Sequence, residues 1–86
     1  MEDKPEDIIM DDYIMITFQA ENIDSVDLKV PVFVKTGELI SMLSKALRLT
    51  FKEGSRLQAE PLGRILDNNL TLLQEGVEHG ALLTLI

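Results

Sequence analysis

The sequence contains no cysteine, no tryptophan and only one histidine. The absence of cysteine excludes disulfides, thiolate metal sites and a cysteine nucleophile. A small domain without such cross-links is typical of a reducing cytosol. No apolar run approaches the ~20 residues that cross a membrane, and the acidic segment 1–7 lacks the basic region of a signal peptide. We therefore expect a cytoplasmic protein without direct membrane insertion.

Negative charge is concentrated at the start of the chain. The net charge is −7 over 86 residues. Residues 1–12 hold six acids and one lysine, a net −5, whereas residues 13–86 hold nine acids and seven bases, a net −2. No basic face suits phosphates, so nucleic-acid binding is not expected. Segment 1–12 is predicted to be an acidic, mostly disordered tail, and residues 13–86 to form one domain.

The tail contains one apolar patch, Ile8–Met10. The patch fits a short docking motif, but a leader segment or an extension of the first strand is the favoured interpretation.

Residues of the types that act in catalysis or metal binding occur here without the partner residues that such sites need. His79 follows Glu78 but precedes Gly80 in a predicted turn, which favours an exposed loop histidine over an acid–base pair. Asp67–Asn69 fits a turn better than a calcium loop, which needs further ligands at fixed spacing. Ser41 and Ser44 have no His/Asp partners. We therefore expect no enzyme, no metal site and no cofactor.

Two predicted strands open the domain. Tyr13–Ala20 is rich in β-branched and aromatic residues, which favours a strand. Val26–Val32 alternates apolar and polar residues, as half-buried antiparallel strands do, and Pro31 belongs at a strand end or a sheet edge. The inward residues of the first strand are expected to be Ile14, Ile16 and Phe18.

A helix is predicted next, capped by Thr36. Its apolar residues recur at helical spacing and form one stripe. The expected stripe contains Leu39, Ile40, Leu43, Ala46 and Leu47, with Ser41, Ser44, Lys45 and Arg48 facing water. Three more strands and a short helical turn follow. We expect the strands at Arg56–Glu60, Arg64–Leu66 and Ala81–Ile86, with the helical turn formed by Leu72, Leu73 and Val77.

This order of elements predicts an α+β fold of the β-grasp type, a five-stranded mixed sheet with one crossing helix and a short 3-10 or helical turn. The segment Leu57–Ile86 is similar to the second half of ubiquitin, carrying the Gly63 turn, the Leu66–Asp67 strand end and the Thr71–Leu72 helix start. The resemblance covers residues 13–86 and implies a ubiquitin-like domain.

Three departures from ubiquitin bear on function. The diglycine used for conjugation does not follow Leu85 and Ile86. Glu60 stands at the strand position that centres the apolar receptor patch of ubiquitin, and Arg64 stands at a chain-linking lysine. We interpret Arg64 and Lys35 as solvated surface charges. The departures imply a protein that binds partners without being conjugated to them.

A second resemblance is more specific. The patterns Ile16–Phe18, Asp27–Pro31 and Leu39–Ile40 are similar to the YukD/EsaB group, small ubiquitin-like proteins of Gram-positive type VII secretion systems. This resemblance implies a cytoplasmic accessory or regulatory protein that docks non-covalently onto a cytoplasmic domain of the membrane machinery. Two alternatives stay open, a ubiquitin-like domain of a larger protein such as a transporter subunit, and a truncated covalent modifier or sulfur carrier.

The sheet face opposite the helix is the predicted binding surface. By alternation it receives residues from the first, third and fifth strands, and an apolar patch rimmed by charge suggests a partner. The strand pairing expected for this fold would make Met15, Thr17, Thr84 and Ile86 neighbours. Scattered exposed aliphatics or a homodimer contact would give the same pattern, so we expect a monomer or weak homodimer. The candidate partner-binding residues are Met15, Thr17, Glu60, Leu82, Thr84 and Ile86.

Overall fold

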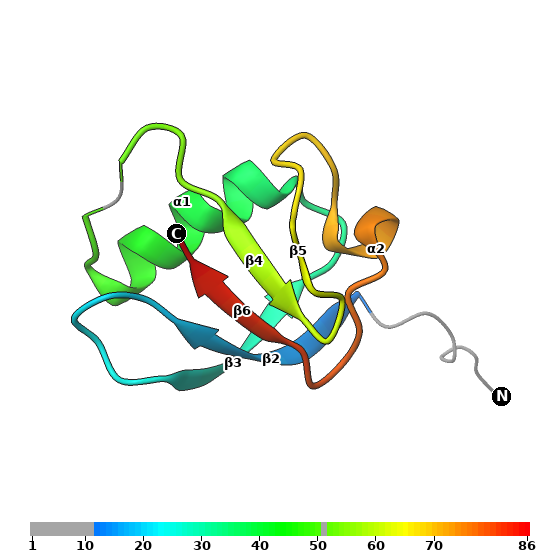
Figure 1. Ribbon diagram of the computed structural model, residues 1–86, viewed down its shortest axis with the longest axis horizontal. Helices are drawn as coiled ribbons and strands as arrows, with labels where there is room; N and C mark the ends of the chain where they lie inside the picture. Colours follow the sequence, from blue (N-terminus) through cyan, green and yellow to red (C-terminus); the bar gives the residue numbers. More distant parts are fainter. Residues whose placement is uncertain (1–11, 51) are drawn as a thin grey trace, which may run out of the picture.

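The computed structural model describes residues 12–50 and 52–86 (Figure 1). Of the acidic tail predicted for residues 1–12, only Asp12 is among the described residues, and its carbonyl accepts from the Val32 N–H. The rest of the tail, with the Ile8–Met10 patch, and Phe51 lie outside the described residues. The elements, in chain order, are β2 (Tyr13–Gln19), β3 (Val26–Pro31), α1 (Thr36–Leu47), β4 (Leu57–Glu60), β5 (Arg64–Ile65), α2 (Leu72–Glu75) and β6 (Leu82–Leu85).

The strands form one five-stranded sheet in the order β3-β2-β6-β4-β5. β2 and β6 run parallel at its centre, and the other neighbouring strands pair antiparallel. α1 crosses behind the sheet in Figure 1, so one face is covered and the other is open. The predicted α+β β-grasp fold, with a five-stranded mixed sheet and a crossing helix, is confirmed.

The alternation of β2 separates the two faces of the sheet. Ile16 and Phe18 are 2% and 1% exposed and join the core, whereas the alternate residues Met15 and Thr17 point to the open face. Successive side chains of a strand point to opposite faces, so this pattern follows directly from the sequence. The core continues through Val30 of β3 and Leu83 of β6, both buried.

The covered face of α1 differs from the predicted stripe at two positions. Leu39, Ile40 and Leu43 are buried as expected, but Ser44 is also buried and Ala46 is exposed. At about 100° per residue, Ser44 and Ala46 lie on opposite flanks of the stripe formed by Leu39, Ile40 and Leu43. Neither the helical period nor the polarity of the side chain therefore predicts that the Ser44 flank is the covered one.

Thr36 does not cap α1 as predicted. The N-cap is Lys35, which makes no side-chain capping bond, and Thr36 is the first helical residue. Its hydroxyl is fully buried and donates to the Leu70 carbonyl over 2.8 Å, while the Thr36 backbone N–H donates to the same carbonyl. The residue thus ties the start of α1 to the loop before α2.

A buried carboxylate connects β5 to α2. Glu75, only 9% exposed, accepts from the Arg64 Nη2 at 2.9 Å and from the Asp67 backbone N–H at 2.7 Å. The Arg64 Nη2 also donates to the Glu75 carbonyl over 2.6 Å. Arg64 is half exposed, but it is a tethered ion-pair partner rather than the purely solvated charge that the sequence suggested.

Candidate protein-interaction surface

The pairing of the strands determines which side chains meet on the open face. Thr17 of β2 lies beside Asp27 of β3 and beside Leu82 of β6, and Leu82 lies beside Glu60 of β4. These four residues form a continuous row across the sheet, which we call the central row. Thr17 Oγ1 donates to Asp27 Oδ1 over 2.7 Å, so the β3 end of the row is ordered by a hydrogen bond.

A second row runs parallel to the first, two residues further along β2. Gln19 of β2 lies beside Thr84 of β6, which lies beside Gln58 of β4, and Gln58 lies beside Ile65 of β5. The Thr84 hydroxyl donates to Gln19 Oε1 at 3.3 Å, and Gln58 Nε2 donates to Glu60 Oε2 at 3.1 Å. Apart from Ile65, this row is therefore polar, and its side chains bond to one another or to Glu60 of the central row.

The structure brings four of the six candidate residues together. Thr17, Leu82 and Glu60 share the central row, and Thr84 lies in the next row. The predicted neighbourhood of Met15 and Ile86 is wrong. In the β2–β6 register, Thr17 lies beside Leu82, so Met15 lies beside Gly80. Gly80 is six residues before Ile86, and at ~3.3 Å per residue this separates Met15 from Ile86 by about 20 Å along the sheet. The sequence predicted the face correctly but could not supply the register.

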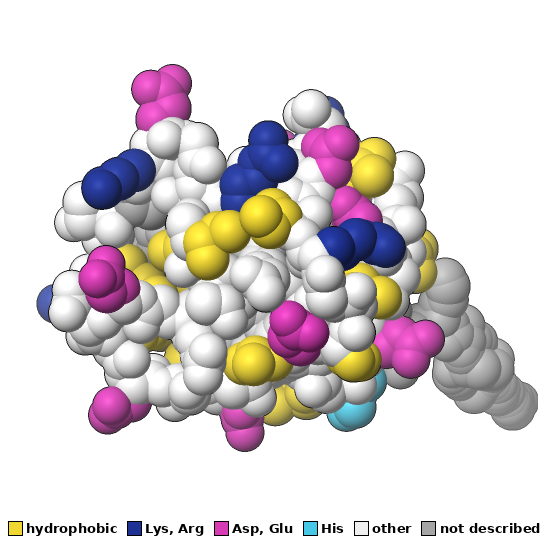
Figure 2. Space-filling view, viewed as in Figure 1, with side chains coloured by type: hydrophobic (Ala, Val, Ile, Leu, Met, Phe, Trp, Pro, Cys, Tyr) yellow, Lys and Arg dark blue, Asp and Glu magenta, His cyan; other side chains and the backbone are white. Residues whose placement is uncertain are grey.

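Each end of the open face carries an exposed hydrophobic residue. Met15 is 39% and Ile86 is 52% exposed. Ile65, 49% exposed, adds a third on β5 that sequence reasoning missed, because a two-residue strand is too short to show alternation. Figure 2 shows the hydrophobic side chains of this face as separate groups among acidic, basic and uncharged ones. The surface is a mixed one rather than the continuous apolar patch expected from the sequence.

Glu60 lies at the end of β4, where the strand runs into the Pro61–Gly63 turn, and Gln58 occupies the middle of the strand opposite Thr84. Both positions are hydrophilic. Any partner that contacts the centre of the open face therefore meets the Leu82 side chain among amide, hydroxyl and carboxylate groups, and meets further apolar side chains towards the ends of the face.

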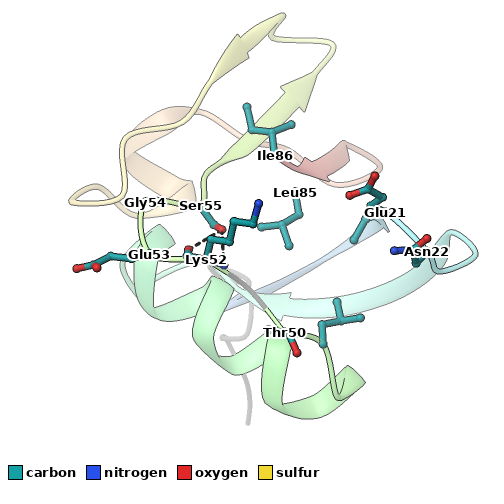
Figure 3. Close-up of a pocket in the computed structure, with 11 residues that line it drawn as sticks. Glu21, Asn22, Thr50, Lys52, Glu53, Gly54, Ser55, Leu85 and Ile86 are labelled. Carbon is teal, nitrogen blue, oxygen red and sulfur yellow. Dashed lines mark hydrogen bonds between the residues drawn. The ribbon is translucent and has the colours of Figure 1, made fainter.

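A hollow of about 370 Å³ adjoins the Ile86 end of the face (Figure 3). It lies between the Glu21–Asn22 turn, the loop that carries Lys52 and Ser55, and the end of β6. Ser55 Oγ donates to the Lys52 carbonyl at 2.7 Å and accepts from the Lys52 N–H at 3.2 Å, which shapes the loop wall. Sequence reasoning gave no sign of this hollow, because its walls are loops distant in the chain.

A second hollow, of about 430 Å³, lies near the Met15 end. It is lined by the Pro61–Leu62 turn and by Gly76–Ala81. His79, one of its lining residues, accepts a hydrogen bond at Nδ1 from the Met15 N–H over 3.1 Å. Before β6 begins, the His79 imidazole thus accepts the β2 hydrogen bond that a neighbouring strand would otherwise accept. This contact gives the histidine predicted in the loop a structural role.

Among residues 12–50 and 52–86, no group of three His, Asp or Glu side chains is placed to hold a metal ion. Over the same residues, none of the helices has the length and apolarity needed to span a bilayer.

Comparison with known families assigns the chain. The family model described as "WXG100 protein secretion system (Wss), protein YukD" matches residues 13–85. The chain belongs to the YukD family. The resemblance recognised in the sequence is thereby confirmed over the whole folded domain, and YukD proteins are associated with the WXG100, or type VII, secretion system.

Solved structures confirm the ubiquitin-like fold of this YukD-family chain. Caldiarchaeum subterraneum ubiquitin is similar with a TM-score of 0.68 and 22% identity, covering 86% of this chain and 91% of that one. The C-terminal ubiquitin-like domain of mouse tubulin-specific chaperone e gives 0.68 and 21%, covering 94% and 92%. The ubiquitin-like domain of Arabidopsis thaliana protein At2g32350 gives 0.70 and 13%, covering 99% and 87%. Curated protein sequences yield no match.

Proposed function

We propose that this YukD-family protein is a non-enzymatic accessory component of a type VII secretion system. It acts in the cytoplasm, where its open sheet face docks non-covalently onto a cytoplasmic domain of the membrane machinery. The observation that carries this proposal is the central row, which places Thr17 and Leu82 side by side on an uncovered face. Membership of the YukD family supports the choice of system.

The composition of the face fits a reversible contact. Non-obligate interfaces combine a small apolar core with a polar rim and about one hydrogen bond per 100–200 Å². On this face, Leu82 and Met15 offer the apolar contacts, and Gln58, Thr84 and Gln19 offer donors and acceptors already ordered by their neighbours. Pre-ordered side chains lose less conformational entropy on binding. The protein therefore acts by occupying a surface, without turnover.

Two methionines on opposite faces provide a matched test. Met15 of β2 is 39% exposed on the open face, and Met42 of α1 is 46% exposed on the helix side. Met15→Arg should weaken binding to the cytoplasmic domains of the secretion membrane proteins at least tenfold by titration calorimetry, because an arginine both clashes and adds charge at the contact. Met42→Arg should leave binding unchanged.

Thr17→Arg extends the test to the central row. It should abolish binding while the melting temperature stays close to that of the wild type, since Thr17 lies outside the core. Equal loss of binding in Met15→Arg and Met42→Arg, or wild-type binding by Thr17→Arg, would contradict docking through the open face.

A further inference from the structure

β3 is an edge of the sheet, and its free side can be identified residue by residue. The Val32 N–H, just beyond β3, donates to the Asp12 carbonyl on the β2 side. Backbone groups two residues apart in a strand point the same way, so the even-numbered residues of β3 bond to β2. The N–H and C=O groups of Asp27 and Lys29 therefore point away from the sheet. Over residues 12–50 and 52–86, β3 has no strand on that side.

The charges of this edge are arranged to complement a second copy of themselves. Asp27 and Lys29 are both exposed and both point to the open face, on either side of Leu28. An antiparallel copy centred on Leu28 sets Asp27 opposite Lys29 of the second copy and Lys29 opposite its Asp27. These are also the residues whose backbone groups point outward, so each opposed pair exchanges two ladder hydrogen bonds. Opposite charges in directly opposed pairs stabilise a sheet.

Neighbouring registers are disfavoured. Moving the second copy by two residues one way places Asp27 opposite Asp27, and moving it the other way places Lys29 opposite Lys29. Like charges directly opposed across strands destabilise the pair. The second shift also sets Asp27 opposite Pro31, which has no N–H to donate. The charges of β3 thus favour the register centred on Leu28 over both neighbouring antiparallel registers.

The inward side of β3 supplies an apolar contact for the same arrangement. Val30 is only 2% exposed, but Val26 and Leu28 stay half-buried, because they lie at the edge of the covered layer. In the register centred on Leu28, the Leu28 side chains of the two copies face each other, and Val26 faces Val30 of the second copy. Self-pairing would cover apolar surface that the single chain leaves partly exposed.

We infer that a second copy of this chain binds β3 through this edge, giving a two-fold dimer with one continuous ten-stranded sheet. The contact is isologous, as in most homodimers. A single strand pair covers less surface than the ~1,200–2,000 Å² of stable interfaces, so the dimer forms reversibly at high protein concentration. Both open faces lie on the same side of the sheet, so the dimer presents two docking faces in parallel.

Charge reversal separates this dimer from any other. Asp27→Lys and Lys29→Asp each set like charges opposite one another, so each variant alone should be monomeric by sedimentation velocity at concentrations where the wild type self-associates. A mixture of the two variants restores both opposed pairs, Lys opposite Asp, and should form a heterodimer. The double variant Asp27→Lys/Lys29→Asp restores both pairs within one chain, and it should self-associate within about threefold of the wild-type dissociation constant.

Cross-linking tests the register itself. The chain has no cysteine, so Leu28→Cys introduces a single thiol. The two-fold axis brings Cα atoms at residue 28 to about 4.5 Å, within the range of a disulfide. Leu28→Cys should oxidise to a covalent dimer at least tenfold faster than Ser25→Cys, an exposed position before β3 that faces Pro31 in the paired register.

The inference is overturned if the mixture of the two charge-reversed variants stays monomeric. It is also overturned if the wild type dimerises and the single reversals do not weaken that dimer, which would place the contact elsewhere. As a control, the amide spectrum of each charge-reversed variant should show the wild-type monomer fold, because the Asp27 and Lys29 side chains lie outside the core.

Discussion

The two halves of this domain are stabilised in different ways. Segment 13–47 is built from long elements with clear periodicity, and both halves contribute buried apolar residues to the core. Segment 57–86 is built from elements of two to four residues. A two-residue strand and a one-turn helix have little stability of their own. In this half, buried or capping polar side chains act together with buried apolar residues such as Leu57 and Leu72 to hold the short elements in place.

The two halves differ in whether their polar side chains take part in holding the fold together. In the first half the polar side chains of β2 and β3 lie on the open face, outside the core. In the second half, the Glu75 carboxylate and the Thr71 side chain are committed to the fold. A search for binding residues by polarity alone would confuse the two sets.

The largest effect is expected in the first half. Phe18→Ala removes a side chain that is 1% exposed in the middle of the core, and it should lower the free energy of unfolding by about 3–5 kcal/mol. Met15→Ala, on the opposite face of the same strand, should cost about 0.5 kcal/mol or less. Urea denaturation followed by circular dichroism measures both, and similar losses at the two positions would show that the covered face is not the stabilising one.

A smaller effect is expected at the carboxylate of the second half. Glu75→Ala leaves the Asp67 N–H without its acceptor and removes the partner of Arg64, and should cost about 1–3 kcal/mol. Glu78→Ala, at an exposed neighbouring position, should cost about 0.5 kcal/mol or less. If Glu75→Ala were as stable as Glu78→Ala in the same denaturation experiment, the second half would not depend on its polar contacts.

The smallest effect is expected at the cap of α2. Thr71 accepts from the Gln74 N–H at 3.0 Å, and the Gln74 side chain accepts from the Thr71 N–H at 2.9 Å. Thr71→Ala should cost about 1 kcal/mol, whereas Thr71→Ser keeps the capping hydroxyl and should cost clearly less. Equal losses in the two variants would assign the effect to the lost methyl group rather than to the cap.

Much of the fold could be predicted from the residue pattern alone. Alternation predicted the inward faces of β2 and β3, and helical spacing predicted Leu39, Ile40 and Leu43 in the core. The prediction of burial or capping failed at residues whose contacts come from distant parts of the chain. Ser44 looked like a surface residue and is buried, and Thr36 looked like a cap and instead bonds to Leu70, 34 residues away. Such contacts join distant segments and leave no local pattern.

The candidate site likewise has one part that the sequence predicts and one part that depends on the tertiary structure. Local alternation is enough to determine which face each strand residue occupies, because side chains alternate with a period of two whatever the partner strand. The neighbours of each residue depend instead on the tertiary structure, because the β2–β6 pairing joins segments more than 60 residues apart. That pairing brings Thr17 to Leu82 and separates Met15 from Ile86. The register of non-local strands is set by the packing of the whole core, and no short stretch of sequence contains it.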